Sequence, residues 1–232
     1  MTFRDWLDSI LNLFFPRVCA ACGEVLLKDE TTVCLKCRYT LPRTGYELHA
    51  HNPLAQSFYG RVKFYAVTAC FFFAKSGKVQ HLIHQLKYKG NKEAGVFLGQ
   101  QLGESIKEAP LFQGIDYLIP VPLHPKRERQ RGYNQALMIA QGIHEVTGIP
   151  IGDRFLARAI YTETQTHKNA EERFKNVKDI FEVHFPEELE GKHILLIDDV
   201  LTTGATLESC AHQLESIPGI TISAATAACA GN

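Results

Sequence analysis

Two adjacent carboxylates, Asp198 and Asp199, stand at the end of an apolar run and just before a turn rich in threonine. The run, residues 194–197 (ILLI), has the uninterrupted apolar character of a strand that is covered on both faces. The turn, residues 202–206 (TTGAT), leads into a segment with helical spacing. Backbone N–H groups at a strand-to-helix turn converge on an anion, and the N-terminus of the helix adds favourable partial charge.

The acids and the turn suit different parts of one ligand. Asp198 and Asp199 would repel a phosphate, but they can accept hydrogen bonds from sugar hydroxyls or bind a divalent cation. The pattern therefore predicts a phosphorylated sugar at the carboxyl end of a parallel sheet, and the alternative is a solvated acidic turn with a threonine N-cap. The residues expected to bind the phosphate are Thr202, Thr203, Gly204, Ala205 and Thr206.

A basic segment, His124–Arg131, follows another apolar strand candidate. It places Lys126, Arg127, Arg129 and Arg131 against the single acid Glu128. Arginine forks match the oxygens of a compact polyanion such as pyrophosphate. A nucleic-acid patch and a solvated basic helix start are the other interpretations. Upstream of this segment, Lys87 is either a further phosphate ligand or part of an exposed helix end capped by Gly90.

Two Cys-x2-Cys pairs, separated by eleven residues, lie near the N-terminus. Four thiolates around one tetrahedral Zn²⁺ are the arrangement that we favour, and redox disulfides are the alternative. No open coordination position is indicated, so the predicted role of the zinc is structural. The expected ligands are Cys19, Cys22, Cys34 and Cys37.

Composition narrows the class of protein. The chain has 232 residues, of which 45% are hydrophobic and 22% are charged, which is typical of a globular protein. Lys+Arg is 25 and Asp+Glu is 25, so a protein that coats nucleic acid with its whole surface is not expected. The apolar start carries Asp5 and Asp8 and ends at Pro16, which indicates an amphipathic helix and not a signal peptide. No run of 18 apolar residues occurs, so we expect no membrane span, and reduced cysteines favour the cytoplasm.

The elements that must position these residues follow an α/β pattern, with a mainly parallel sheet flanked by helices. We expect residues 1–50 to form the amphipathic helix and a small zinc-binding unit, and residues 60–232 to form the large domain. Residues 46–60 are expected to be a loop, and the polar stretch 161–178 is either a functional loop or a solvated loop or exposed helix. Strands are expected at 62–73, 116–122, 155–160, 193–200 and 220–229, and helices at 78–88, 92–107, 133–147 and 204–216.

The segment LLIDDVLTTGAT resembles the phosphoribosyl-pyrophosphate (PRPP) signature of type I phosphoribosyltransferases. Over nearly the whole chain, the order of the cysteine pairs, LKYKG, PVPLHPKRERQRGYNQ, the TQT segment and IDDVLTTGAT resembles the ComF (competence protein F, GntX-like) family. Residues that match its polar-loop pattern are Gln165, Arg173 and Asn176. The resemblance implies an N-terminal zinc ribbon, a phosphoribosyltransferase-like domain and a link to DNA uptake during natural transformation.

The resemblance also implies roles for individual residues. Asp198 and Asp199 would contact ribose hydroxyls, and Lys87, Arg127 and Arg131, with Mg²⁺, would stabilise the departing pyrophosphate. Two kinds of function follow. The first is an enzyme that transfers phosphoribosyl from PRPP. The second is a module that senses PRPP or a related phosphorylated sugar while it binds single-stranded DNA or a DNA-processing protein. An oligomer is compatible with either.

Overall fold

The computed structural model describes residues 16–158 and 181–230. The amphipathic helix expected before Pro16, the loop at 161–178 and its residues Gln165, Arg173 and Asn176 lie outside the described residues. The helices are α2 (Leu35–Thr40), α3 (Pro53–Gln56), α4 (Lys78–Tyr88), α5 (Lys92–Lys107), α6 (Pro125–Arg131), α7 (Gln135–Thr147) and α9 (Ala205–Leu214). The strands are β1 (Val67–Phe73), β2 (Tyr117–Pro120), β3 (Leu156–Arg158), β4 (Phe181–Val183), β5 (His193–Leu201) and β6 (Thr221–Ala230).

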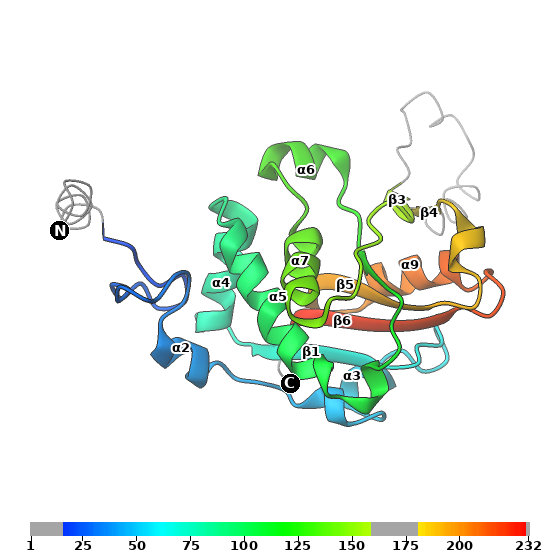
Figure 1. Cartoon of the computed structure of the whole chain (residues 1–232), viewed down its shortest axis with the longest axis horizontal. Coiled ribbons are helices and arrows are strands. Elements are labelled where there is room, and N and C mark those ends of the chain that lie inside the picture. The colour runs from blue at the N-terminus through cyan, green and yellow to red at the C-terminus, as the bar shows by residue number, and fades with distance from the viewer. Residues whose placement is uncertain (1–15, 159–180, 231–232) are drawn as a thin grey trace.

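Four strands form a parallel sheet in the order β1-β6-β5-β2 (Figure 1). The central strand β5 pairs with β2 on one side, with Leu195 opposite Leu118, and with β6 on the other, with Leu196 opposite Ala224. The expected parallel sheet flanked by helices is confirmed. The parallel arrangement brings the carboxyl ends of β2, β5 and β6 to the same edge.

The two faces of the sheet are covered by different elements. Successive side chains of β5 alternate between them, so that Leu195 joins the cluster that includes α4, α5 and α7, whereas Leu196 joins the cluster that includes α9. All four side chains from Ile194 to Ile197 are buried. This double burial explains why the run in the sequence is continuously apolar.

Helices α5 and α7 approach closely because glycines face each other where they cross. A Cβ atom added at Gly99 would lie 2.0 Å from the carbonyl oxygen of Ile139, and one added at Gly142 would lie 2.0 Å from that of Val96. The main chains are therefore in direct contact. This contact fixes the start of α7 relative to the sheet edge where the candidate site lies.

The cysteine-containing segment lies at one end of the molecule, next to α4 (Figure 1). An antiparallel bridge joins Val18 and Val25 on either side of the first cysteine pair, and α2 follows. Hydrogen bonds connect this segment to α4, since His81 Nδ1 lies 3.1 Å from the carbonyl oxygen of Ala21. In the segments 16–158 and 181–230, no helix is long and apolar enough to cross a membrane.

Three local expectations differ from the structure. The first strand begins at Val67 rather than at residue 62, because residues 62–66 form an irregular approach to β1. The strand expected at 155–160 pairs as β3 with β4 in a separate antiparallel hairpin, so it does not join the main sheet. The loop expected between 46 and 60 contains a 3-10 turn at Tyr46–Leu48 and helix α3, which lies against β1.

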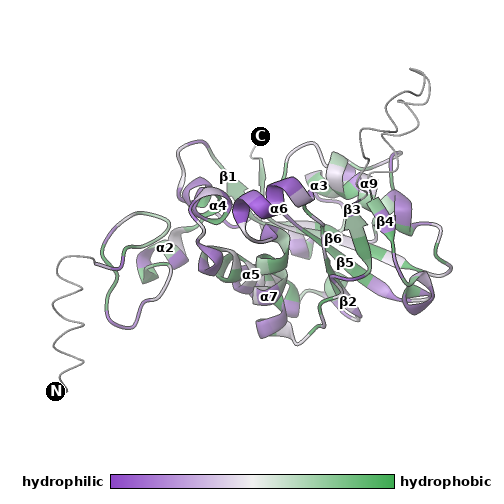
Figure 2. Cartoon of the chain, turned by 90° about the horizontal axis from the view of Figure 1, so that it is seen from above, coloured by the Kyte–Doolittle hydropathy of each residue, from purple (hydrophilic) through white to green (hydrophobic). Residues whose placement is uncertain are grey.

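The basic segment folds as its own helix, α6, which is strongly hydrophilic (Figure 2). Pro125 occupies its first position, where no N–H is required, and the side chain of His124 accepts a hydrogen bond from the backbone N–H of Lys126 (3.1 Å). Gly132 ends the helix with a φ of 80°. These local signals define a short helix that stands above the sheet edge (Figure 1).

Candidate active site

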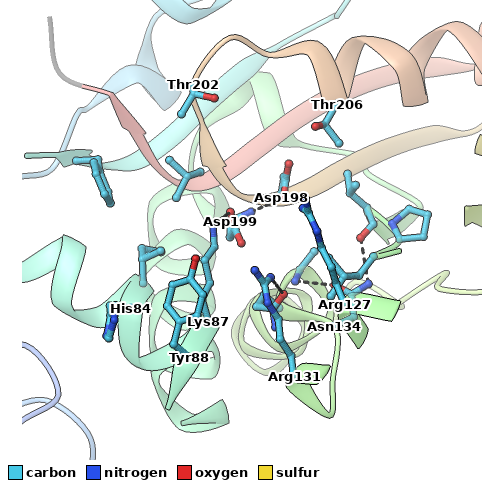
Figure 3. A pocket seen from close by; sticks show the side chains of 18 of the residues that line it. His84, Lys87, Tyr88, Arg127, Arg131, Asn134, Asp198, Asp199, Thr202 and Thr206 are labelled. Atoms are coloured by element: carbon cyan, nitrogen blue, oxygen red, sulfur yellow. Dashed lines mark hydrogen bonds and ion pairs between the residues drawn. The ribbon is translucent and has the colours of Figure 1, made fainter. Parts of the chain in front are cut away.

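The paired acids lie within β5, close to its carboxyl end. Lys87, at the last turn of α4, places its Nζ 2.8 Å from Oδ1 of Asp199, and Figure 3 shows the lysine reaching toward the acids. The backbone N–H of Asp199 donates to Oδ1 of Asp198 at 2.8 Å. The lysine expected to serve the site therefore meets the acids through tertiary structure, although 111 positions separate Lys87 from Asp198 in the sequence.

The two acids differ in their electrostatic surroundings. Burial, and then the neighbouring carboxylate of Asp199, raise the pKa of Asp198 to about 7. The N–H of Asp199 and the charge of Lys87 oppose this increase only in part. Asp199 thus pairs with a lysine, whereas the pKa of Asp198 is raised toward neutrality. Such a pair can both accept and donate hydrogen bonds to hydroxyl groups.

In the turn after β5, the main chain at Gly204 packs directly against the ring of Phe58. Gly204 is the N-cap of α9 and has a φ of 78°, and a Cβ atom there would lie 2.5 Å from Cζ of Phe58. Arg61 fastens the turn from outside, because it donates to the carbonyl oxygen of Thr203 (3.4 Å) and pairs with Glu208 (2.9 Å). The amide of Ala205 donates to Oγ1 of Thr203 (3.4 Å). The next amides of α9 lack intrahelical acceptors, as in any helix, and can serve an anion.

The opposite wall of the site is basic and comes from α6 and the start of α7. Arg131 donates to Oε1 of Gln135 at 2.6 Å, and its guanidinium lies 5.6 Å from the ring centroid of Tyr88. Asn134 caps α7 and also donates to the carbonyl oxygen of Val121 (3.0 Å), just after β2. This bond ties the basic wall to the edge of the sheet.

These groups surround a single cleft of about 560 Å³ (Figure 3). Of the residues singled out from the sequence, Thr203, Gly204 and Ala205 form the turn but do not line the cleft. The predicted residues that do line it are Lys87, Arg127, Arg131, Asp198, Asp199, Thr202 and Thr206. The structure thus brings the three predicted elements of the site, acids, turn and basic segment, around one space.

Several lining residues were missed by sequence analysis. On α4, His84 precedes Lys87 by three residues and Tyr88 by four, so helical periodicity could have found them. Phe73 ends β1 and gives the α4 side of the cleft an apolar surface, together with Ile83. The last missed residue, Arg158, ends β3, and no local motif marks it.

The four cysteines of the N-terminal segment come together as expected. Their sulfur atoms all lie within 4.8 Å of one another, and Sγ of Cys22 is 3.8 Å from Sγ of Cys34. Zn–S bonds of about 2.3 Å in a tetrahedron require a separation of about 3.8 Å, so the donor set fits zinc. Burial and the thiols of Cys22 and Cys34 raise the pKa of Cys37, so binding a cation would release protons. All seven cysteines are free thiols.

Comparison with known families defines the class of the protein. Residues 136–230, from α7 to β6, match the family described as phosphoribosyl transferase domain. This match, together with the parallel sheet, confirms the type I phosphoribosyltransferase-like fold. The region includes the paired acids and the threonine-rich turn but ends short of Lys87 and α6 on the N-terminal side.

Curated relatives extend the similarity beyond this domain. The chain is 28% identical over 200 residues to the DNA utilization protein YhgH of Escherichia coli K12, covering 85% of this chain and 83% of the relative. It is 35% identical to competence protein F of Haemophilus influenzae (59% of this chain, 61% of the relative). It is also 32% identical to YhgH of Salmonella typhi, of which it spans 59%. The predicted resemblance to the ComF family is confirmed.

Solved structures include a likeness to glutamine PRPP amidotransferase from Bacillus subtilis, with ADP and GMP. The sequence identity is 20%, the TM-score is 0.43, and the match covers 59% of this chain and 26% of that enzyme.

Proposed function

We propose that the cleft binds PRPP and that the protein transfers its phosphoribosyl group to an acceptor with release of pyrophosphate. The observation that carries the proposal is the convergence of the Lys87–Asp199 pair, the threonine-rich turn and the basic helix α6 around one cleft at the carboxyl edge of a parallel sheet. Each of these three parts has a charge that suits one portion of PRPP, namely the ribose hydroxyls, the 5′-phosphate or the diphosphate.

The assignment follows from charge. The amides at the start of α9, with the hydroxyls of Thr202 and Thr206, would hold the 5′-phosphate. Asp198 and Asp199 would hold the ribose hydroxyls, which neutral sugars offer as donors. Arg127 and Arg131 would hold the diphosphate. Hard carboxylate oxygens also suit Mg²⁺, so Asp198 or Asp199 would share the ion with the diphosphate, and Mg²⁺ would neutralise part of the leaving-group charge.

The reaction is a displacement at the anomeric carbon. The acceptor forms a bond to this carbon, and the bond to the diphosphate oxygen breaks with its electron pair remaining on the leaving group. Because the basic wall holds the leaving group, the acceptor would enter from the apolar part of the cleft, where Phe73, Ile83 and His84 lie. Guanidinium groups aimed at the diphosphate stabilise the negative charge as it develops.

The direct test is pyrophosphate release. Purified protein is incubated with PRPP, Mg²⁺ and a panel of nucleobases and amines, and released pyrophosphate is measured with a coupled assay. We expect release that depends on both Mg²⁺ and one class of acceptor. Binding of PRPP with no turnover on any acceptor would remove the enzyme proposal and leave the binding proposal standing.

The acids supply the matching binding test. The double substitution Asp198→Asn and Asp199→Asn should abolish PRPP binding in calorimetry, because neither amide restores both the charge and the acceptor capacity. Asp116→Asn is the matched control, since Asp116 pairs with Lys192 (3.1 Å) at the amino end of β5, away from the cleft. Equal PRPP affinity in the double variant and the control would overturn the sugar assignment.

The names of the relatives favour a second candidate function. DNA utilization and competence proteins act in DNA handling, so we propose a ComF-like role in DNA uptake, within the cytoplasm. In this version the cleft senses PRPP or a related sugar phosphate, while α6 or the cysteine segment engages single-stranded DNA or a DNA-processing partner. Lys126 and Arg129 on α6 are exposed and available for such contacts.

Salt dependence distinguishes this candidate. Single-stranded DNA binding should weaken linearly with the logarithm of salt concentration, and Arg129→Gln should reduce the slope by about one unit. Arg129 does not line the cleft, so PRPP binding should not change in this variant. Absence of salt-dependent DNA binding by the wild-type protein would leave a protein partner as the form of the proposal that survives.

A further inference from the structure

Arg158 is an arginine in the cleft that no sequence motif marked. It is the last residue of β3, opposite Phe181 of β4 in the antiparallel hairpin. Its guanidinium carbon lies 5.3 Å from the ring centroid of Phe181, so the aromatic ring supports the planar group. Arg158 is half-buried and lines the cleft that Arg127 and Thr206 also line. It therefore belongs to a wall distinct from the basic helix α6.

The charges around Arg158 are incomplete without an anion. Burial, and then the positive charge of Arg127, lower the pKa of the Arg158 guanidinium, which indicates that the two cations face the same space. Among the residues that the structure describes, neither arginine forms an ion pair with a carboxylate. Arg158 is half-buried and Arg127 is exposed. An anion between the two guanidinium groups would offset their mutual repulsion.

Arg154, a second arginine near β3, has a structural role and serves as a comparison. Arg154 stacks against Phe155 (4.9 Å) and Phe185 (5.3 Å) and forms an ion pair with Glu188. It thus has both an aromatic support and a carboxylate partner, and it does not line the cleft. Within residues 16–158 and 181–230, Arg158 has the aromatic support but no carboxylate partner, so its charge is open to a ligand there.

We propose that Arg158 is a further anion-binding residue and that Arg158 and Arg127 together hold the diphosphate of the donor. This inference rests on the proposed binding of PRPP. The diphosphate is the better occupant of this place, because the amides of α9 and the threonine hydroxyls already serve the 5′-phosphate. The diphosphate also carries more negative charge than the 5′-phosphate, and it gains further negative charge as it leaves. Two arginine forks from different elements, α6 and β3, match its terminal oxygens.

The test measures three probes by calorimetry on the full chain: PRPP with Mg²⁺, inorganic pyrophosphate and ribose 5-phosphate. Arg158→Gln should weaken the binding of pyrophosphate and of PRPP at least tenfold, and should leave the affinity for ribose 5-phosphate within twofold of wild type. Arg158→Lys keeps the charge without the stacked plane and should recover part of the loss. Arg154→Gln is the matched control and should bind all three probes as the wild type does.

The outcomes distinguish the role of Arg158 from the proposed binding of PRPP. Wild-type affinity of Arg158→Gln for pyrophosphate and PRPP overturns the role of Arg158 and leaves the proposed function intact. Pyrophosphate binding that depends on Arg158, without PRPP binding by the wild type, supports the anion site and overturns the proposed function. Equal weakening of all three probes overturns the assignment to the diphosphate. If Arg158→Gln does not fold, as judged by circular dichroism, Arg158→Lys decides. A loss of affinity confined to PRPP and pyrophosphate supports the role of Arg158, and wild-type affinity for both overturns it.

Discussion

At the scale of single residues, the site combines groups whose function conflicts with stability. Asp198 is half-buried beside a second acid at the cleft, where loss of hydration disfavours its charged form. The positive charge of Lys87 contacts Asp199 and not Asp198 directly. Unfavourable ionisation that persists beside a cleft is typical of binding and catalytic sites. The same feature makes the residue testable through stability alone.

The raised pKa of Asp198 gives a pH dependence with a definite sign. An acid with a pKa of about 7 when folded and near 4 when unfolded favours the folded state fully below pH 4, and this contribution is lost between pH 4 and 7. An asparagine side chain cannot ionise, so Asp198→Asn should be more stable than wild type by on the order of 2 kcal/mol at pH 8, and equal to it at pH 4. Urea unfolding in metal-free buffer at both pH values measures the difference. A variant that is less stable at pH 8 contradicts the assignment.

Gly204 should tolerate no side chain, for two separable reasons. Its φ of 78° strains any other residue, and Phe58 fills the space that a Cβ would need. Gly204→Ala should therefore lower the free energy of unfolding by about 2–3 kcal/mol and weaken PRPP binding, because the turn must move. Gly114→Ala isolates the first reason, since Gly114 has a φ of 69° but open space around it, and it should cost about 1 kcal/mol. Equal losses in the two variants would show that the Phe58 contact is unimportant.

At the scale of elements, the position of the basic wall depends on helix packing away from the site. Helix α7 begins at Asn134 and Gln135, beside the cleft, and its middle contacts α5 main chain to main chain at Gly142. The hydrogen bond from Asn134 to Val121 then holds the start of α7 against the end of β2. A shift of α7 along α5 would therefore move Arg131 and Gln135 relative to the acids.

Gly142→Ala tests this dependence. The added methyl group would lie 2.0 Å from the carbonyl oxygen of Val96, so the helices must separate, at a cost of about 3 kcal/mol in unfolding free energy. PRPP affinity should fall as well, although Gly142 is not in the cleft. Gly103→Ala on α5 is the control: its Cβ meets Val146 at 3.0 Å, and the better helix propensity of alanine offsets most of that strain. Wild-type stability in Gly142→Ala would contradict the close packing, and an unchanged PRPP affinity would separate the packing from the site.

At the scale of the whole molecule, the cysteine segment and the cleft share one helix. The start of α4 contacts the cysteine segment, through His81 with Ala21 and through Lys78 with Thr40 (2.9 Å), and its end carries Lys87. The buried cysteines belong to the same hydrophobic cluster as Leu82 and Leu86 of α4. A structural metal at the cysteines would therefore stabilise one support of the cleft.

We expect about one zinc per chain by elemental analysis, and Cys37→Ser should lose it. Loss of the metal should lower the Tm and accelerate hydrogen exchange in residues 78–83, because the segment that packs against them becomes disordered. Exchange in α7 serves as the internal control, since α7 packs on α5 and the sheet rather than on the cysteine segment. Two disulfides in freshly purified, metal-free protein would favour the redox alternative over the zinc site.

Much of this protein could be predicted from the sequence because its signals are local. The buried run 194–197, the acids that follow it and the glycine at the turn predict a strand, a ligand edge and a helix start from neighbouring residues. The paired spacing of Cys19 with Cys22 and of Cys34 with Cys37 likewise predicts its cluster. In each case the residues that cooperate are close together along the chain, so periodicity and turn chemistry are sufficient.

Tertiary structure alone decided which distant segments meet. Whether Lys87 serves the site or an exposed helix end depended on the packing of α4 against β1 and α5, which no spacing encodes. Arg158 was missed because β3 leaves the main sheet to pair with β4, and only that hairpin turns its last residue into the cleft. The physical reason is that side-chain convergence depends on the packing of whole elements across long sequence separations, whereas local patterns determine only the elements themselves.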